Sequence, residues 1–312
     1  MNHAVLLVAL STLAPAALAQ DGQSAAKESE SPVAPEAEAR KVNVELSVSG
    51  FATSSTDFEG DNGNVQVSSV GAELGVDIPA GERGTLSLGF GTSWSFFDFG
   101  GDAGFGASEP WEDVVEYKVS ARYSRRLNEQ WGFFVGGFVG SSGEQDADFS
   151  KTIVGGGFGG VSYAASERFR IGLGLGAATQ LEDDVYVIPV VNINWKITDK
   201  WLLSSDQQPR GGGMKLSYQM CEPATIYVAA GYLSKEFRLD EDGATPDGVG
   251  QESGFPVAIG TDWKVAPQVS IGLRAGVIFG HEFELDDSTG DELQQLDADA
   301  TPFLSGTLKF SF

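Results

Sequence analysis

Few residues of this chain could carry out covalent chemistry. It has two histidines, His3 and His281, and Glu282 directly follows the second one. Hydrolytic catalysis commonly rests on a histidine that works with a serine or an aspartate. Alternation along the segment 268–283 places His281 on the apolar side of an extended strand, away from the polar side chains. We therefore do not expect His281 to be catalytic, and we predict that the protein is not an enzyme.

The other usual signs of a reactive site are weak. The single Cys221 excludes an internal disulfide and a cysteine-based zinc site. Glycine-rich segments lie within predicted strands and no helix follows them, so they do not fit a phosphate-binding loop. The alternate glycines Gly172, Gly174 and Gly176 would instead let a strand bend or leave space beside it. We predict no cofactor and no metal.

Charged residues at alternate positions within extended segments are the strongest chemical signal. In the segment 112–127, Glu116, Lys118 and Arg122 alternate with apolar residues. Positions of this kind are Glu45, Glu73, Asp77, Glu116, Lys118, Arg122, Arg170, Lys196, Lys215, Asp262, Arg274 and Lys309. They could line a water-filled path in which mixed charges set selectivity. Alternatively, they could pair across neighbouring strands and fill the space between them.

The elements that would carry these residues are strands, because the apolar positions recur with a period of two. Strands are predicted near 41–51, 64–78, 84–98, 112–127, 131–142, 151–165, 168–181, 184–198, 200–206, 211–220, 224–239, 253–265, 268–283 and 301–312. All except 200–206 are long enough to cross a bilayer at a tilt. About fourteen strands are therefore expected, with 12 to 16 possible.

The connections between these strands alternate in length. Short turns are expected at 79–83, 128–130, 166–167, 199, 221–223 and 266–267, and longer polar stretches at 52–63, 99–111, 143–150, 182–184, 206–212, 240–252 and 284–300. Short turns at one end and longer loops at the other are typical of transmembrane barrels. Four tryptophans, Trp131, Trp195, Trp201 and Trp263, lie beside short turns and are predicted to form a periplasmic aromatic girdle.

The last strand supports the same architecture. Phe312, Phe310 and Leu308 alternate with small or polar residues up to the end of the chain. This resembles the C-terminal signature of Gram-negative outer-membrane β-barrels, in which the terminal aromatic residue is read by the insertion machinery. The resemblance implies an all-β fold, a transmembrane antiparallel up-and-down barrel over residues 41–312, in the outer membrane of a Gram-negative bacterium. Outer-membrane lipid, lipopolysaccharide and the insertion machinery are the implied partners.

The first 40 residues differ in character. Residues 1–19 resemble a secretory signal peptide, and residues 20–40 are rich in Ala, Glu, Ser and Pro, which predicts a disordered periplasmic leader. Fatty-acid transporters of the outer membrane are similar in strand number, but they have an N-terminal hatch inside the barrel, which this polar leader does not match.

The charge balance limits the function. The chain carries 20 basic and 44 acidic residues, a net charge of −24, which excludes binding to nucleic acid. Acidic residues cluster in the longer connections, namely Asp57, Glu59, Asp61, Glu144, Asp146, Asp148, Glu182, Asp183, Asp184, Asp240, Glu241, Asp242, Glu284, Asp286, Asp287, Asp291, Glu292, Asp297 and Asp299. These carboxylates could hold divalent cations that bridge to lipopolysaccharide, or simply form a solvated surface.

Two functions follow from the sequence. The first is a passive channel for small hydrophilic solutes or ions. The alternative is a non-conducting surface or structural barrel whose acidic loops bind cations, lipopolysaccharide or a partner.

Overall fold

The structure is a computed structural model, and it describes residues 41–60, 63–101, 110–182, 185–208 and 211–312. The predicted signal peptide and leader lie outside the described residues, as do Asp61, Asp183 and Asp184. In the described part, no helix is long and apolar enough to cross a membrane. Its one helix is the short 3-10 turn η1, Phe149–Lys151.

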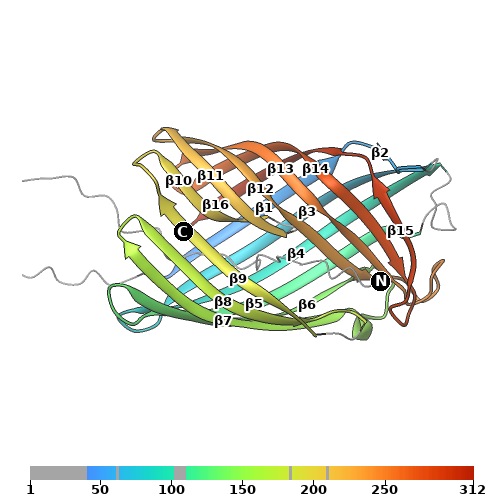
Figure 1. The fold of residues 1–312 in the computed structure, drawn as a ribbon, viewed down its shortest axis with the longest axis horizontal. Coiled ribbons are helices and arrows are strands. Elements are labelled where there is room, and N and C mark those ends of the chain that lie inside the picture. The colour runs from blue at the N-terminus through green and yellow to red at the C-terminus, as the bar shows by residue number, and fades with distance from the viewer. Residues whose placement is uncertain (1–40, 61–62, 102–109, 183–184, 209–210) are drawn as a thin grey trace, which may run out of the picture.

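Fourteen antiparallel strands form a closed barrel (Figure 1). They are β1 Asn43–Thr53, β3 Gly63–Pro79, β4 Gly84–Gly101, β5 Asp113–Arg126, β6 Trp131–Glu144, β7 Ile153–Ser166, β8 Phe169–Thr179, β9 Val185–Lys196, β10 Trp201–Gln208, β11 Gly211–Cys221, β12 Ala224–Arg238, β13 Val249–Ala266, β14 Val269–Asp286 and β16 Thr301–Ser311. Two short strands, β2 Thr56–Asp57 and β15 Glu292–Ala298, extend the sheet beyond the wall. The prediction of about fourteen up-and-down strands is confirmed.

The barrel closes where the first and last strands meet. β1 pairs with β3 on one side and with β16 on the other, so no barrel edge is left open at this point. Beyond the last residue of β16, the N–H of Phe312 donates to the carbonyl of Val44 at 2.9 Å, and the N–H of Val44 donates back at 3.2 Å. The terminal residue is thus part of the ladder that closes the wall.

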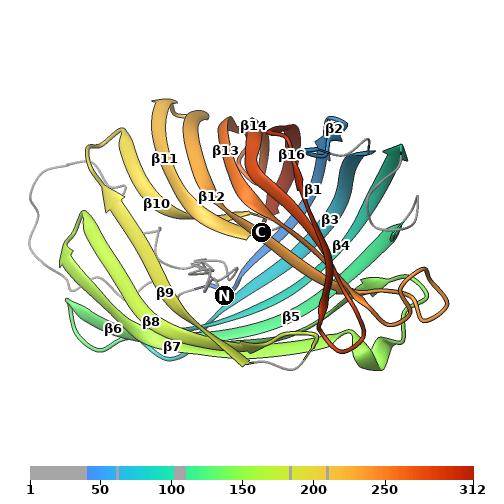
Figure 2. The same ribbon diagram turned by 45° about the vertical axis from the view of Figure 1, so that its right-hand side comes forward.

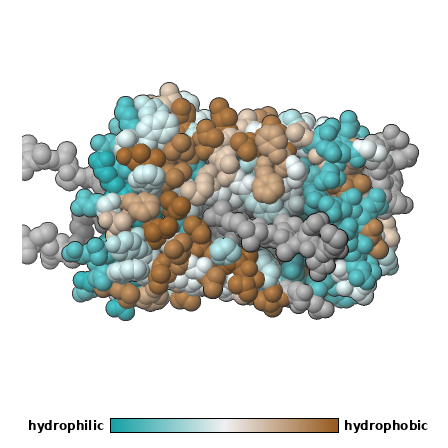
Figure 3. Space-filling model, in the orientation of Figure 1, coloured by the Kyte–Doolittle hydropathy of each residue, from teal (hydrophilic) through white to brown (hydrophobic). Residues whose placement is uncertain are grey.

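An apolar belt surrounds the barrel. Large apolar side chains that face outward remain exposed on successive strands, for example Val70 on β3, Phe90 on β4, Val119 on β5, Leu175 on β8 and Ile259 on β13. Figure 3 shows apolar surface across the middle of the molecule and hydrophilic surface at both ends. A closed antiparallel barrel with such a belt is the architecture of Gram-negative outer-membrane proteins. The chain is an outer-membrane β-barrel.

Short connections lie at one end of the barrel and longer ones at the other, and one predicted connection needs correction. At the end that carries the C-terminus, two to four residues link β3 to β4, β5 to β6, β7 to β8, β9 to β10, β11 to β12 and β13 to β14. The long connection expected at 206–212 is wrong, because β10 and β11 stay paired up to Gln208 and Gly211. An alternation of apolar positions cannot reveal this pairing, because the residues at these strand ends are polar or glycine.

Three strands continue past the belt at the opposite end. On β13 and β14 the outward apolar positions end at Phe255 and Phe279, while the strands run on to Val249 and Asp286. β12 likewise extends to Arg238, where it forms a parallel bridge with Gly143 of β6. The extensions of β12, β13 and β14 together with β15 are called the mouth sheet here. It crosses the extracellular end of the barrel and reaches the far wall (Figure 2).

Candidate functional site: the barrel interior

Charged side chains from β1 to β5 gather on one interior wall. They surround a cavity of about 200 Å³ whose lining includes Glu45, Glu73, Asp77, Glu116, Lys118 and Arg122. Ser87 donates a hydrogen bond to Asp77 at 2.5 Å, and Ser93 donates one to Glu116 at 2.7 Å. Six of the twelve predicted lumen residues therefore lie together in one place.

A second cavity, of about 350 Å³, lies between β1 and the strands from β11 to β16. Lys215, Asp262, Arg274 and Lys309 line it, and the Nζ of Lys215 lies 3.3 Å from a carboxylate oxygen of Asp262. Lys309 also joins the two walls, because its Nζ lies 3.0 Å from Glu45. The lining also includes the apolar side chains of Phe51, Leu233, Pro256, Ile278 and Phe303.

The remaining two predicted lumen residues lie near the periplasmic end. Lys196 forms an ion pair at 3.6 Å with Asp199 of the β9–β10 turn, and about half of its side chain is exposed. Arg170 is the second residue of β8 and pairs across the ladder with Asn194 of β9. Neither residue is among those that line the two cavities.

The glycine-rich strands β6, β7 and β8 are packed by phenylalanine rings. A Cβ atom on Gly136 would lie 2.5 Å from the Phe158 ring, one on Gly160 would lie 2.6 Å from Phe134, and one on Gly156 would lie 2.8 Å from Phe138. These glycines therefore provide the flat surface on which the rings lie. Of the glycines singled out from the sequence, Gly172 also lies beneath the Phe134 ring.

Two lumen cations stack on the same rings. The Nζ of Lys118 lies 4.9 Å from the centre of the Phe138 ring, and the guanidinium carbon of Arg122 lies 5.0 Å from that of Phe134. Such contacts hold a cation in place by attraction to the π face. Glycine, aromatic ring and cation thus form successive layers from the wall towards the lumen.

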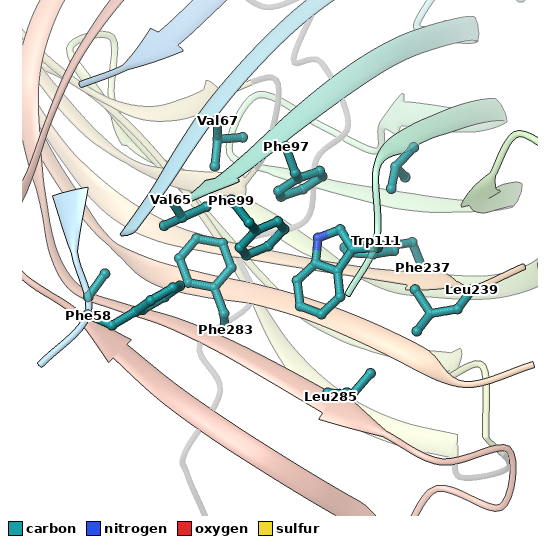
Figure 4. Close-up of a cluster of buried hydrophobic side chains, with 12 residues drawn as sticks. Phe58, Val65, Val67, Phe97, Phe99, Trp111, Phe237, Leu239, Phe283 and Leu285 are labelled. Atoms are coloured by element: carbon teal, nitrogen blue, oxygen red, sulfur yellow. The ribbon is translucent and has the colours of Figure 1, made fainter. Parts of the chain in front are cut away.

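An aromatic core fills the extracellular mouth. Phe97, Phe99 and Trp111 from the β4–β5 side pack against Phe237 of β12 and Phe283 of β14 (Figure 4). Trp111, Phe237 and Phe283 are almost completely buried. Because opposite walls contribute to this cluster, it closes the axial path above the two cavities.

Arg238 fixes the mouth sheet to the far wall. Its guanidinium donates to the carbonyls of Lys151, Leu181 and Asp247 at 3.2, 2.9 and 2.7 Å, and it forms an ion pair with Glu182. The residue itself is buried. A planar guanidinium with five donors suits this role, because it bonds several fixed acceptors at once.

Lys235 is an interior cation that the sequence analysis missed. Its buried Nζ lies 2.8 Å from Glu116 of β5 and donates to Ser95 of β4 at 2.9 Å. The pair links β12 to strands on the other side of the lumen. Lys235 has the same parity as Tyr227 and Leu233, both of which line the interior cavity, and this parity could have identified it.

The predicted orientation of His281 is wrong. His281 is completely buried, with Nε2 3.1 Å from Glu252 and Nδ1 3.0 Å from the hydroxyl of Thr301. The cause is a β-bulge, in which the β13–β14 register shifts between Ser253 and Phe255 and Gly280 has a φ of 52°. One extra residue turns every later side chain of β14 to the opposite face.

The four predicted girdle residues all lie on the outer surface near the periplasmic turns. Trp131 begins β6 and Trp201 begins β10, while Trp195 and Trp263 lie close to the C-terminal ends of β9 and β13. Each side chain is about half exposed. Trp131 and Trp201 also contact aromatic rings of the neighbouring strand, Tyr163 and Tyr218.

Two carboxylates of the acidic connections accept several local hydrogen bonds. Hydrogen bonds from Ser150 hold the pKa of Asp148 below its ordinary value, and those from Thr289 and Asp291 do the same for Asp287. In the described part of the chain, no three His, Cys, Asp or Glu side chains are grouped so that they could hold a metal ion.

The comparisons with known proteins identify a family. Residues 46–309 match the family described as a domain of unknown function (DUF6268), and the chain belongs to it. No curated protein matches the chain.

Several solved structures have a similar shape. The COG4313 outer membrane channel from Pseudomonas putida F1 is 13% identical, with a TM-score of 0.48 over 91% of this chain and 100% of that one. A Pseudomonas aeruginosa FadL homologue is 10% identical, with a TM-score of 0.48 over 87% and 90%. The P. putida toluene transporter TodX is 8% identical, with a TM-score of 0.44 over 86% and 89%. Likeness at these values carries no conclusion about solutes.

Proposed function

We propose that this protein is a passive outer-membrane channel for small hydrophilic solutes or ions. The observation that carries the proposal is the charged interior. Ten of the predicted charged residues, five acidic and five basic, line the two cavities of one closed barrel. Mixed charges along a water-accessible path set ion preference.

The closed mouth means that axial passage requires movement of the mouth sheet. Arg238 and the aromatic core hold this sheet against the far wall. The alternative function, a non-conducting surface barrel, is favoured by the same closure. The acidic connections would then be the binding surface.

Single-channel recording of the refolded protein in a planar bilayer tests the proposal. Because Arg238 joins the mouth sheet to Lys151, Leu181 and Glu182 of the far wall, Arg238→Ala is expected to increase the open fraction several-fold over the wild type. Neutralising Lys118, Arg122 and Arg274 in that background should shift the reversal potential in a salt gradient towards cation preference, because three interior positive charges are lost.

Lys264→Gln is the matched control, because Lys264 is an exposed residue near the periplasmic end of β13. It removes a positive charge away from the cavities and should leave the reversal potential unchanged. Folded and inserted Arg238→Ala protein that shows no conductance steps would contradict the channel and leave the surface barrel as the better explanation.

A further inference from the structure

The two interior cavities adjoin each other at β1 and carry opposite charge. Ser49 lines both of them. The cavity on the side of β3 to β5 is lined by four acidic and two basic side chains, whereas the cavity on the side of β11 to β16 is lined by three basic side chains and one acidic side chain. The interior is therefore negative on one side of β1 and positive on the other. A solute that spans β1 meets both signs of charge.

The strand register places a carboxylate and an ammonium group on either side of one residue. Ser47 of β1 pairs with Glu73 of β3 on one side and with Lys309 of β16 on the other. At about 4.8 Å between neighbouring strands, the Cα atoms of Glu73 and Lys309 are about 10 Å apart. Both residues line the interior cavities. One small molecule can therefore contact both charged groups.

Both groups have capacity for a ligand. Glu73 is exposed, and within the described part of the chain it forms no ion pair or hydrogen bond. It lies over Gly91, where a Cβ atom would be 3.6 Å from its Cγ atom. The Nζ of Lys309 lies 3.0 Å from Glu45, yet 43% of the Lys309 side chain is exposed. An ammonium group has three donors, so Lys309 can donate to a second carboxylate as well as to Glu45.

Tyr227 positions two further cations of the positive cavity. Its ring lies over Gly260, where a Cβ atom would overlap the ring. The Nζ of Lys215 lies 4.6 Å from the ring centre and the guanidinium carbon of Arg274 lies 5.5 Å from it. The Nε of Arg274 also donates to the Tyr227 hydroxyl at 3.4 Å. Because these contacts hold the cations in place, little side-chain freedom is lost when an anionic group binds.

The apolar part of the positive cavity lies on the extracellular side of its charges. Three strands show the same order towards the extracellular end, namely Lys309 then Phe303 on β16, Arg274 then Ile278 on β14, and Asp262 then Pro256 on β13. The ring centres of Phe51 and Phe303 are 5.4 Å apart, and Ile278 packs in the same cluster. A ligand whose charged groups lie at the level of Arg274 and Lys309 thus places its remaining part among apolar side chains.

We propose that the two cavities together bind a small zwitterion with an apolar substituent, of the class of the apolar α-amino acids. Its ammonium group binds Glu73, its carboxylate binds Lys309 and Arg274, and its side chain packs against Phe51 and Phe303. This names the solute class of the channel and rests on that proposed function, although binding itself is measurable without conduction.

The two signs of charge are what select a zwitterion. An anion with the same apolar group gains the basic side chains of one cavity and faces the acidic side chains of the other. A cation meets the reverse arrangement. A molecule that carries both charges satisfies both walls at once, and like-charge juxtaposition disfavours the singly charged analogues.

Isothermal titration calorimetry of the refolded protein in detergent micelles tests the proposal with four compounds: phenylalanine, hydrocinnamate, phenethylamine and glycine. Hydrocinnamate lacks only the ammonium group, phenethylamine lacks only the carboxylate, and glycine lacks only the apolar side chain. Phenylalanine should bind several-fold more tightly than each of the other three. Equal affinity for the three aromatic compounds would overturn the proposal, because it would mean simple apolar partition. Tighter binding of hydrocinnamate than of phenylalanine would overturn it as well.

Two variants assign the groups. Glu73→Gln should weaken the binding of phenylalanine several-fold and leave that of hydrocinnamate unchanged. Lys309→Gln should weaken both of these ligands without weakening phenethylamine. A merely structural effect would not produce this crossed pattern. Glu129→Gln is the matched control, because Glu129 is exposed in the β5–β6 turn, and it should bind all four compounds as the wild type does.

Heat-modifiable migration in electrophoresis shows that each variant is folded. A folded Glu73→Gln protein that binds phenylalanine as tightly as the wild type would contradict the site. The channel is scored separately by planar-bilayer conductance. Selective phenylalanine binding without conductance steps in Arg238→Ala would remove the channel and keep the site, whereas conductance with equal affinity for all four compounds would remove the site and keep the channel.

Discussion

Gly280 decides which side chains of β14 point into the mouth. Up to Phe279 the strand keeps its parity, and Phe279 is exposed on the outer surface. After the bulge, His281, Phe283 and Leu285 are buried inside. Without the extra residue, Phe283 would face outward and the aromatic core would lose its β14 member. The bulge is therefore a structural device of the mouth, and the buried contact of His281 with Glu252 depends on it.

Gly280→Ala is expected to destabilise the protein by about 1–2 kcal/mol, because a residue with a Cβ atom is strained at positive φ. Space is not the cause, since the nearest atom to an added Cβ is 3.9 Å away. Gly306→Ala is the control, with a nearest neighbour at 3.7 Å and no positive φ. Urea unfolding in lipid vesicles should separate the two variants, and equal stability would show that the bulge tolerates a side chain.

At the level of elements, the strands were predictable and the mouth sheet was not. The period-two pattern located all fourteen barrel strands, because a lipid-facing position must be apolar wherever it occurs. The same pattern cannot show that β12, β13 and β14 fold inward past the belt. Phe237 and Phe283 look like ordinary strand residues, and Trp111 falls in an expected loop. Excess length was the available signal, since β13 and β14 each have 18 residues.

Among the interior residues, alternation along a strand is a useful guide where the pairing with neighbouring strands is regular. It assigned Glu45, Asp77 and Lys118 to the interior, and in the structure these three residues line one cavity. It failed at His281, where a bulge changed the count, and it gave no warning that the β9–β10 ladder stops. Bulges and ladder ends depend on pairing with a second strand, which a pattern along one strand does not contain.

The mouth sheet is expected to respond to pH. Burial, together with the charge of Asp286, raises the pKa of Glu284 to about 7, and burial raises that of Glu236 to about 7. Both residues lie beyond the apolar belt. A carboxyl whose folded pKa is raised favours the folded form while it is protonated, so this contribution falls as pH rises from about 4.5 to about 7.

We therefore expect a larger open fraction at pH 8 than at pH 5 in planar-bilayer recordings of the wild type. Glu236→Gln with Glu284→Gln should remove most of the difference. Asp287→Asn is the control, because hydrogen bonds lower the pKa of Asp287 and it stays ionised over this range. A pH response that is unchanged in the double Gln variant would place the sensing groups elsewhere.

For the whole molecule, the uneven ladder predicts where the barrel opens first. β1 forms long ladders with β3 and β16, and Phe312 adds hydrogen bonds to Val44. The strands that close the barrel are therefore well paired. β9 and β10, by contrast, share only three residue pairs. Amide exchange follows local opening, and donors without a ladder partner exchange without any opening.

Hydrogen exchange of the reconstituted protein should accordingly be uneven around the barrel. The amides of Val187 and Val191, which have the parity that faces β10, should exchange far faster than those of Ile188 and Val190, which face β8. The β1–β16 amides from Val48 to Gly50 are the internal control and should be among the slowest, since both neighbours pair with them. Equal protection of the two edges of β9 would mean that β9 and β10 are fully paired in the membrane. The ladder would then be continuous around the described part of the barrel wall.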